Sequence, residues 1–211
     1  TPLTAVIGYS DMLRSKRMSE ENIQIAADYI FSEGKRLESM SMKLFDLILL
    51  GKTGIEKKRI YVPDLLEAIG SSAAPIMAER NVTLRVRDCD AWIMGDKDLL
   101  RTVFINMLDN ASKASRGKGV VVLRARHKSS VVLIEVEDHG CGIPKEDLEK
   151  ITEAFYMVDK SRSRKSGGAG LGLSLAAKII ELHGGKLKIQ SEVDIGTCMQ
   201  VFFREVPADA S

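Results

Sequence analysis

Two asparagines and a lysine recur at helical spacing near the middle of the chain: Asn106, Asn110 and Lys113. Steps of four and three residues place their side chains on one face of a helix. Burying such groups without partners costs on the order of 1–3 kcal/mol each, so a ligand is one explanation for them. An amide oxygen suits Mg²⁺ that keeps water and phosphate ligands, and a lysine suits phosphate as a point charge. A solvent-facing polar stripe is the alternative interpretation.

A carboxylate followed by alternate glycines is the second candidate site. Asp138 ends a β-rich run and precedes Gly140 and Gly142. Glycine lets the backbone pass close beside a flat ligand, and an ionised carboxylate accepts hydrogen bonds without donating any. Asp138 is therefore a candidate acceptor for the exocyclic amine of adenine, and a plain glycine turn is the alternative.

A third candidate is the glycine-rich stretch from Ser166 to Leu173, which runs directly into an amphipathic helical pattern. The N–H groups at a helix start favour anions such as phosphate, and the basic segment 159–165 stands just ahead. These features predict a phosphate-binding loop with a mobile cationic flap. The loop lacks the Gly-Lys-Ser/Thr of a Walker loop and the spacing of a dinucleotide fingerprint. A flexible linker is the alternative.

The elements that must position these groups alternate between helix and strand. A helical pattern covers Leu3–Leu13, and a heptad-like stripe runs from Ile23 to about Leu50. Together they predict an α-helical hairpin or bundle, and the core stripe of an ordinary long helix is the alternative. Residues 51–54 form a plausible joint. Beyond it, the pattern predicts these strands: Arg59–Val62, Val82–Val86, Ala91–Met94, Val120–His127, Val131–Glu137, Lys186–Ser191 and Cys198–Arg204. Helices are expected over these segments: Pro63–Glu79, the residues after Asp96, Lys145–Ile151 and Leu171–Leu182. This order predicts an α+β fold: a two-layer α/β sandwich with helices on one face of one sheet, preceded by the hairpin.

The composition is that of an ordinary globular protein, with 45% hydrophobic and 28% charged residues among 211. A net charge of +2 is too balanced to favour nucleic acid as a partner. No apolar run approaches the length of a membrane span. The three cysteines show no metal-ligand spacing and fit a reducing compartment.

Taken together, these motifs resemble those of sensor histidine kinases, in the order that family has them. Residues 106–113 look like the N box, and residues 138–144 look like the G1 box. Phe155-Tyr156 with its basic tail is similar to the F box and nucleotide lid, residues 168–173 resemble the G2 box, and Gly196-Thr197 resembles the short box after it. Thr1-Pro2-Leu3-Thr4 looks like the tail of the H box. The resemblance covers nearly the whole chain. Met157 departs from it, because many relatives carry an arginine there, and His139 stands where asparagine is common.

The resemblance implies a Bergerat-type catalytic ATP-binding domain at residues 55–206. Residues 1–52 would be part of the dimerisation and histidine phosphotransfer hairpin. ATP and Mg²⁺ are the implied cofactors, with Asp138 at adenine, Asn110 on the metal and Lys113 at phosphate. Asn106 and Lys113 would be catalytic. The implied nucleotide contacts are Asn106, Asn110, Lys113, Asp138, Gly140, Gly142, Ile143, Tyr156, Arg162, Gly168, Gly170, Leu171, Gly172, Leu173 and Thr197.

The activity implied by the resemblance is transfer of the ATP γ-phosphoryl group to a histidine, for relay to the receiver domain of a response regulator. The intact protein would be a membrane-anchored homodimer with this part in the cytoplasm. ATP-hydrolysing relatives such as gyrases resemble one another in placing a glutamate one turn before the Mg²⁺ asparagine. Asn106 stands there, and an amide takes no proton near neutral pH, which favours transfer. A nucleotide-sensing module without chemistry is the other alternative.

The three histidines of this chain, His127, His139 and His183, lie outside any H box. Family spacing puts the phosphoacceptor four residues before Thr1. We therefore expect this chain to bind ATP without phosphorylating itself. His183 is interpreted as a cation at a helix end.

Overall fold

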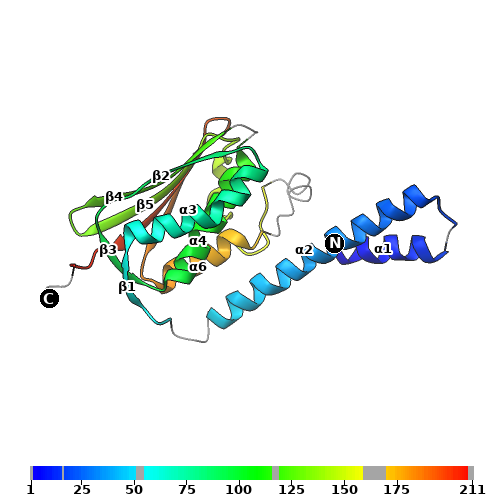
Figure 1. The fold of residues 1–211 in the computed structure, drawn as a ribbon, viewed down its shortest axis with the longest axis horizontal. Helices are drawn as coiled ribbons and strands as arrows, with labels where there is room; N and C mark the ends of the chain where they lie inside the picture. The colour runs from blue at the N-terminus through cyan, green and yellow to red at the C-terminus, as the bar shows by residue number, and fades with distance from the viewer. Residues whose placement is uncertain (1, 16, 51–54, 116–118, 159–169, 209–211) are drawn as a thin grey trace.

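The computed structural model describes residues 2–15, 17–50, 55–115, 119–158 and 170–208. A helical hairpin extends away from a mixed α/β body (Figure 1). Helix α1 (Pro2–Ser15) packs along helix α2 (Glu20–Leu50), and the rings of Tyr9 and Tyr29 stack with centroids 4.7 Å apart. The predicted hairpin is confirmed.

The body is built on a five-stranded sheet in the order β2-β4-β5-β7-β6. Its strands are β2 (Thr83–Arg87), β4 (Val120–Lys128), β5 (Val131–Asp138), β6 (Lys186–Glu192) and β7 (Gly196–Arg204). All neighbours are antiparallel except β2 and β4, which run parallel. Strands β1 (Lys58–Tyr61) and β3 (Trp92–Gly95) form a separate antiparallel pair.

Three helices cover one face of this sheet (Figure 1): α3 (Val62–Glu79), α4 (Lys97–Ala114) and α6 (Gly172–Leu182). The core lies between the two layers, where Phe104 and Leu108 of α4 meet sheet residues such as Ile134, all fully buried. Burying each such side chain contributes about 1.5–3 kcal/mol. The expected two-layer sandwich is therefore the observed fold.

Helix α4 carries the candidate polar groups, and neighbouring residues in the sequence determine where it begins. The carboxylate of Asp96 accepts hydrogen bonds from the backbone N–H groups of Asp98 and Leu99, both at 3.0 Å. These are donors that the first helical turn otherwise leaves unpaired. Asp96 is therefore the N-cap of α4, and this cap fixes where the helix begins.

Two local predictions are wrong. The helix expected over Lys145–Ile151 is a single 3₁₀ turn, Lys145–Asp147, followed by turns. Ile151 is the one residue of that stretch that is buried, at 8% exposure, so packing against the core does not support a longer helix.

His183 does end a helix, but it is not a cation. Its Nε2 accepts a hydrogen bond from the backbone N–H of Asp96 at 2.9 Å, and its Nδ1 lies 2.7 Å from the carbonyl oxygen of Ile179. Because a backbone N–H can only donate, Nε2 must be unprotonated and Nδ1 must carry the proton. Burial lowers the pKa of this imidazole. A neutral His183 thus ties the end of α6 to the start of α4.

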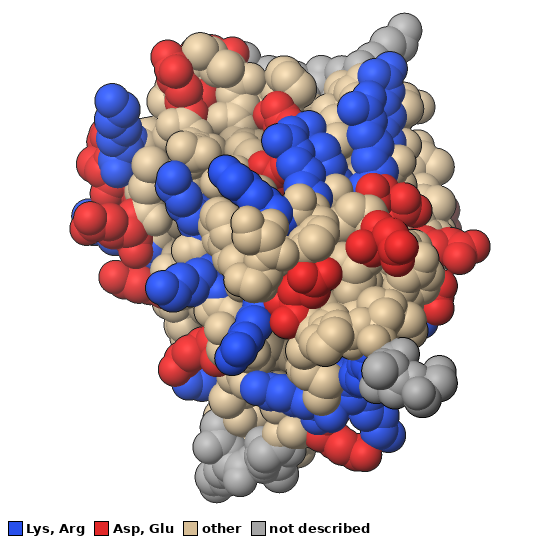
Figure 2. Space-filling model, turned by 90° about the vertical axis from the view of Figure 1, so that its left-hand side faces the viewer, with Lys and Arg blue, Asp and Glu red and all other residues tan. Residues whose placement is uncertain are grey.

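The outer face of the sheet carries a row of charged and polar side chains. In one row across three strands, Glu135 accepts hydrogen bonds from Arg124 at 3.0 Å and Gln200 at 2.8 Å. Figure 2 shows Lys and Arg side chains with Asp and Glu among them over the face it views. Within the described ranges, no helix is both long and apolar enough to cross a membrane.

Candidate functional site

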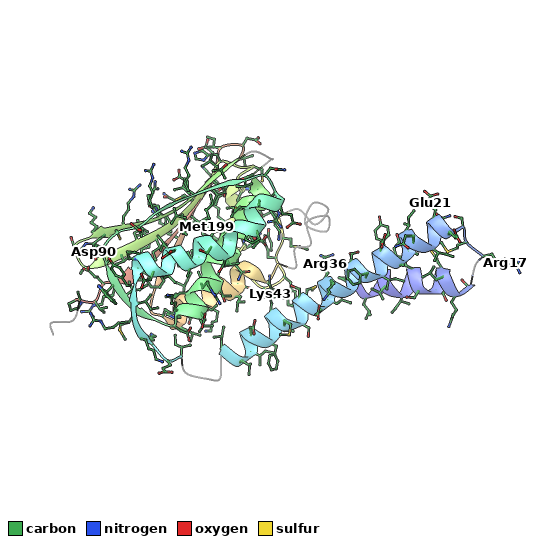
Figure 3. All side chains as sticks on the ribbon, viewed as in Figure 1. Arg17, Glu21, Arg36, Lys43, Asp90 and Met199 are labelled. Carbon is green, nitrogen blue, oxygen red and sulfur yellow. The ribbon has the colours of Figure 1, made fainter. Side chains whose placement is uncertain are left out.

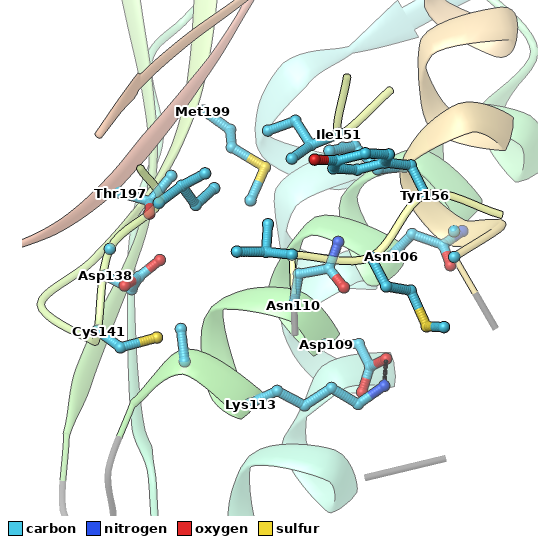
Figure 4. A pocket seen from close by; sticks show the side chains of 18 of the residues that line it. Asn106, Asp109, Asn110, Lys113, Asp138, Cys141, Ile151, Tyr156, Thr197 and Met199 are labelled. Atoms are coloured by element: carbon cyan, nitrogen blue, oxygen red, sulfur yellow. Dashed lines mark hydrogen bonds and ion pairs between the residues drawn. The ribbon is translucent and has the colours of Figure 1, made fainter. Parts of the chain in front are cut away.

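A cavity of about 470 Å³ opens between α4, the end of β5 and the segment that follows it (Figure 4). It collects most of the residues that the sequence singled out. Those lining it are Asn106, Asn110, Lys113, Asp138, Gly142, Ile143, Tyr156, Gly170, Gly172, Leu173 and Thr197.

Four of the predicted contacts are not in this lining. Arg162 and Gly168 lie outside the described residues. Leu171 is fully buried, and its carbonyl accepts hydrogen bonds from Ser174 and Leu175 at the start of α6. Gly140 acts by its small size: a Cβ there would lie 2.5 Å from the carbonyl carbon and oxygen of Ala114. This close approach lets the loop after β5 pass the end of α4.

Asp138 forms one wall of the cavity and is only 3% exposed. Its Oδ1 accepts a hydrogen bond from the backbone N–H of Gly140 at 2.9 Å. Burial raises the pKa of this carboxyl, and the backbone hydrogen bonds from Gly140 and Thr197 partly oppose that rise. A buried acceptor of this kind is suited to a ligand group that brings its own N–H.

Strands β5 and β7 bring Thr197 directly opposite Asp138. The hydroxyl of Ser191 donates to the carbonyl of Gly196 at 2.9 Å and lies 2.8 Å from the hydroxyl of Thr197. Because the one hydroxyl proton of Ser191 is used, Thr197 is the donor to Ser191. The backbone N–H of Ile143 also donates to Ser191 at 2.8 Å. This network holds the wall that faces Asp138.

The glycine at position 142 is required by its backbone. Gly142 has φ +66°, and a Cβ there would lie 2.0 Å from the carbonyl oxygen of Glu192. A side chain at this position would therefore displace the loop between β5 and the cavity.

The opposite wall is the polar face of α4, as predicted from spacing (Figure 4). The amide nitrogen of Asn106 donates to the carbonyl of Thr102 at 2.9 Å, which orients the side chain. Lys113 donates to Oδ2 of Asp109 at 2.7 Å, and Arg80 donates to Oδ1 of the same carboxylate at 2.7 Å. Asp109 is therefore the charge that positions Lys113.

The pKa of Asp109 reflects these contacts. Burial alone would raise it, but the ammonium of Lys113 and the guanidinium of Arg80 outweigh burial and hold the pKa below its usual value. Asp109 is thus ionised at neutral pH, and each of its two oxygens accepts a hydrogen bond from a cation.

The residues present fit a magnesium ion that arrives with phosphate. Nowhere in the described residues do three or more His, Cys, Asp or Glu side chains gather as a metal site, so the protein offers no closed metal cage. Mg²⁺ in nucleotide sites commonly takes one or two protein oxygens and fills its other positions with phosphate and water. The amide oxygen of Asn110, in the cavity wall between Asp138 and Lys113, is a metal ligand of that kind.

Several lining residues were missed by sequence reasoning. Asp109 stands four residues before Lys113, so helical spacing alone would have found it. Cys141 and Met199 lie in or beside recognised motifs but carry no chemical signal of their own. Ser39 and Lys43 belong to α2, far from the motifs in sequence, and only the tertiary structure reveals them.

Comparison with known proteins agrees with this geometry. The family model "Histidine kinase-, DNA gyrase B-, and HSP90-like ATPase" matches residues 95–207, more than half of the chain. This chain belongs to that family. The matched range contains α4, β5, α6 and β7, the elements that form most of the cavity. The chain thus contains an ATP-binding catalytic domain of the histidine kinase type.

Among curated proteins, the chain is 48% identical over 210 residues to the signal transduction histidine-protein kinase ArlS of Staphylococcus aureus (strain USA300). That match covers 96% of this chain and 46% of ArlS. The chain therefore spans about half the length of the curated relatives it matches.

Solved structures of histidine kinases share the fold. ThkA in complex with the response regulator protein TrrA matches with a TM-score of 0.79 and 20% identity, over 98% of this chain and 58% of ThkA. Full-length ShkA in complex with AMPPNP matches with a TM-score of 0.73 and 24% identity, over 99% of this chain and 44% of ShkA. Both matches extend over the hairpin as well as the sandwich.

Proposed function

We propose that this chain is the kinase core of a sensor histidine kinase, which transfers the γ-phosphoryl group of ATP to a histidine. Residues 55–206 would be the catalytic domain, and residues 1–52 part of the dimerisation and phosphotransfer hairpin. The phosphoacceptor would precede Thr1 by four residues. The 48% identity to a histidine kinase and the composition of the cavity support this proposal.

The observation that carries it is the absence of a suitable general base in the described cavity wall. Two carboxylates line the described part of that wall, Asp109 and Asp138. Asp109 is paired with Arg80 and Lys113 and has a lowered pKa, so it is a weak base. Asp138 lies across the cavity from the lysine (Figure 4). At position 106 an amide stands, which cannot activate water, so transfer is favoured over hydrolysis.

Each residue has a role in this proposal. Asp138 accepts from the adenine amine and thereby sets the position of the nucleotide. Lys113, held by Asp109, lies where it neutralises phosphate charge, and Asn106 orients the phosphate chain. Asn110 would hold Mg²⁺, which when bound neutralises the charge that develops on the phosphates. Catalysis is then mainly positioning and electrostatic stabilisation, as in phosphoryl transfer generally.

A labelled-ATP experiment tests the proposal. We expect this chain to bind ATP but to take up no label, and a longer chain with the upstream histidine to acquire an acid-labile, base-stable label. Release of inorganic phosphate without labelling would favour the hydrolytic alternative. Binding without either reaction, even in the longer chain, would favour a nucleotide-sensing module.

We also propose a homodimer and a response-regulator partner for the intact, membrane-anchored protein. Helix α2 exposes Ile23, Tyr29, Leu44 and Ile48, each between 42% and 51% exposed. A second copy would cover such a helical face. ThkA, which shares the fold, was solved with a response regulator. Sedimentation of the longer chain tests dimerisation, and loss of label to an added receiver domain tests the partner.

A further inference from the structure

The nucleotide cavity is not made by the catalytic domain alone. Helix α2 packs against α6 and passes beside the sandwich, and Ser39 and Lys43 of α2 line the same cavity as the polar face of α4. Figure 3 shows Lys43 on α2 where the helix passes the sandwich. Lys43 also lines a second cavity, of about 420 Å³, together with Asn106 and Asp109. Its side chain thus lies where hairpin and α4 meet.

This place has an excess of positive charge. Asp109 already pairs with Lys113 and Arg80, and Lys43 lines both cavities together with Asp109. Among the described residues, no further carboxylate lines either cavity at this end. Burial lowers the pKa of the Lys43 ammonium, the Asp109 charge partly opposes this, and Lys113 adds to the lowering. Half-buried cations without enough partner charge are costly. An incoming anion would remove that cost.

We propose that Lys43 is a phosphate contact contributed by the hairpin, so that the terminal phosphates of ATP join α2 to α4. This inference rests on the proposed role of the cavity as a nucleotide site. Lys113 and Lys43 then reach the phosphates from two separate elements. Binding of ATP therefore strengthens the docking of the hairpin on the catalytic domain, and loss of a phosphate weakens it. The phosphorylation state of the nucleotide would be transmitted directly to α2.

The competing explanation is that Lys43 only packs. Its aliphatic stem could cover α4 while its ammonium is attracted to Asp109, with no role in nucleotide binding. The two explanations differ in one measurable respect. A phosphate contact affects ATP more than AMP, whereas a packing residue affects all nucleotides alike or none.

The test compares Lys43→Gln, which removes the charge, with Lys43→Arg, which retains it. Lys35→Gln is the matched control, because Lys35 lies on the same helix, is exposed and pairs with Glu38 at 2.8 Å. Calorimetry gives the dissociation constants of ATP, ADP and AMP for each. We expect Lys43→Gln to weaken ATP binding about 3- to 10-fold, as for a partly screened charge contact. AMP binding should stay unchanged, Lys43→Arg should recover most of the loss, and Lys35→Gln should match wild type.

Hydrogen exchange provides a second readout. In the wild-type chain, ATP should slow exchange around residues 39–43 of α2 more than AMP does, and Lys43→Gln should abolish that difference. An unchanged ATP-to-AMP affinity ratio in Lys43→Gln would overturn the proposal, and unchanged AMP binding verifies that this variant is folded. If the wild-type chain binds no adenine nucleotide, the proposed function itself is refuted, and so is this inference, which rests on it.

Discussion

Replacing Asp138 by asparagine changes one atom of the buried wall that should recognise adenine. The substitution keeps the size of the side chain but replaces one carboxylate oxygen by an NH₂ group. The amide oxygen can still accept from the backbone N–H of Gly140, which lies 2.9 Å from Oδ1 in the wild-type chain. The NH₂ group must then take the place of the second oxygen and face the cavity.

The magnitude follows from burial. At 3% exposure, water does not replace the lost acceptor. In Asp138→Asn, the new amide NH₂ and the adenine amine would both be donors and could not pair. A buried polar group that loses its partner costs about 1–3 kcal/mol. ATP affinity should therefore fall roughly 5- to 150-fold, since 1.4 kcal/mol is tenfold.

A base analogue makes the assay specific. ITP carries a carbonyl where ATP carries the amine, so it should bind poorly to wild type and regain affinity in Asp138→Asn. Calorimetry with both nucleotides measures the reversal. Glu137→Gln is the matched control, because Glu137 is the neighbour of Asp138 in β5 but pairs with Arg124 at 3.1 Å. The preference of Glu137→Gln for ATP over ITP should equal that of wild type.

Stability should move in the opposite direction. The pKa of Asp138 is raised by burial, so ionisation of this group in the folded state reduces stability as pH rises through its folded pKa. Asp138→Asn avoids that loss and should unfold at higher urea than wild type at pH 7, with the advantage shrinking in acid. If ATP and ITP affinities are unchanged in a folded variant, Asp138 does not recognise the base, and the reasoning is refuted.

Three further predictions concern α4. Asn110→Ala should weaken binding of Mg·ATP more than binding of metal-free ATP, and calorimetry showing equal losses would contradict the metal assignment. Asn106→Glu should raise slow release of inorganic phosphate, because it supplies a possible general base; no gain in a folded, ATP-binding variant would count against that role for position 106. Asp109→Ala leaves Arg80 and Lys113 without their shared carboxylate and should lower the free energy of unfolding by about 1–3 kcal/mol in urea titrations. Because the folded pKa of Asp109 is lowered, this loss should be full near neutral pH and disappear as pH falls through that pKa; a loss independent of pH would refute the ion-pair explanation.

Local signals predicted much of this protein because the interactions behind them are short-range. The spacing of Asn106, Asn110 and Lys113 implied a shared face, and α4 places all three in the cavity wall. The β-rich runs Val120–His127 and Val131–Glu137 predicted two strands, and the structure has β4 and β5 there, paired antiparallel across a short turn. The N-cap at Asp96 depends only on the next three residues. In each case, the partners lie within one helical turn or one hairpin.

Where sequence reasoning was wrong, distant groups decided the outcome. The helix dipole favours a cationic histidine at a helix C-terminus, but burial and the N–H of Asp96, far away in sequence, make His183 neutral. The stretch Lys145–Ile151 has acceptable helical residues, yet too little of its surface is buried to sustain a helix. Neither outcome is encoded in the neighbouring residues.

The sequence by itself determined the chemical inventory of the site: an acceptor at Asp138, amides and an ammonium on one helix face, and glycines where the backbone must turn. Only the tertiary structure decided how these parts meet. The β5–β7 register sets Thr197 opposite Asp138, and the docking of α2 brings Lys43 to the same cavity. The physical reason is that periodicity describes one element at a time. Which elements face each other is decided by burial of the shared core, and that depends on the whole chain.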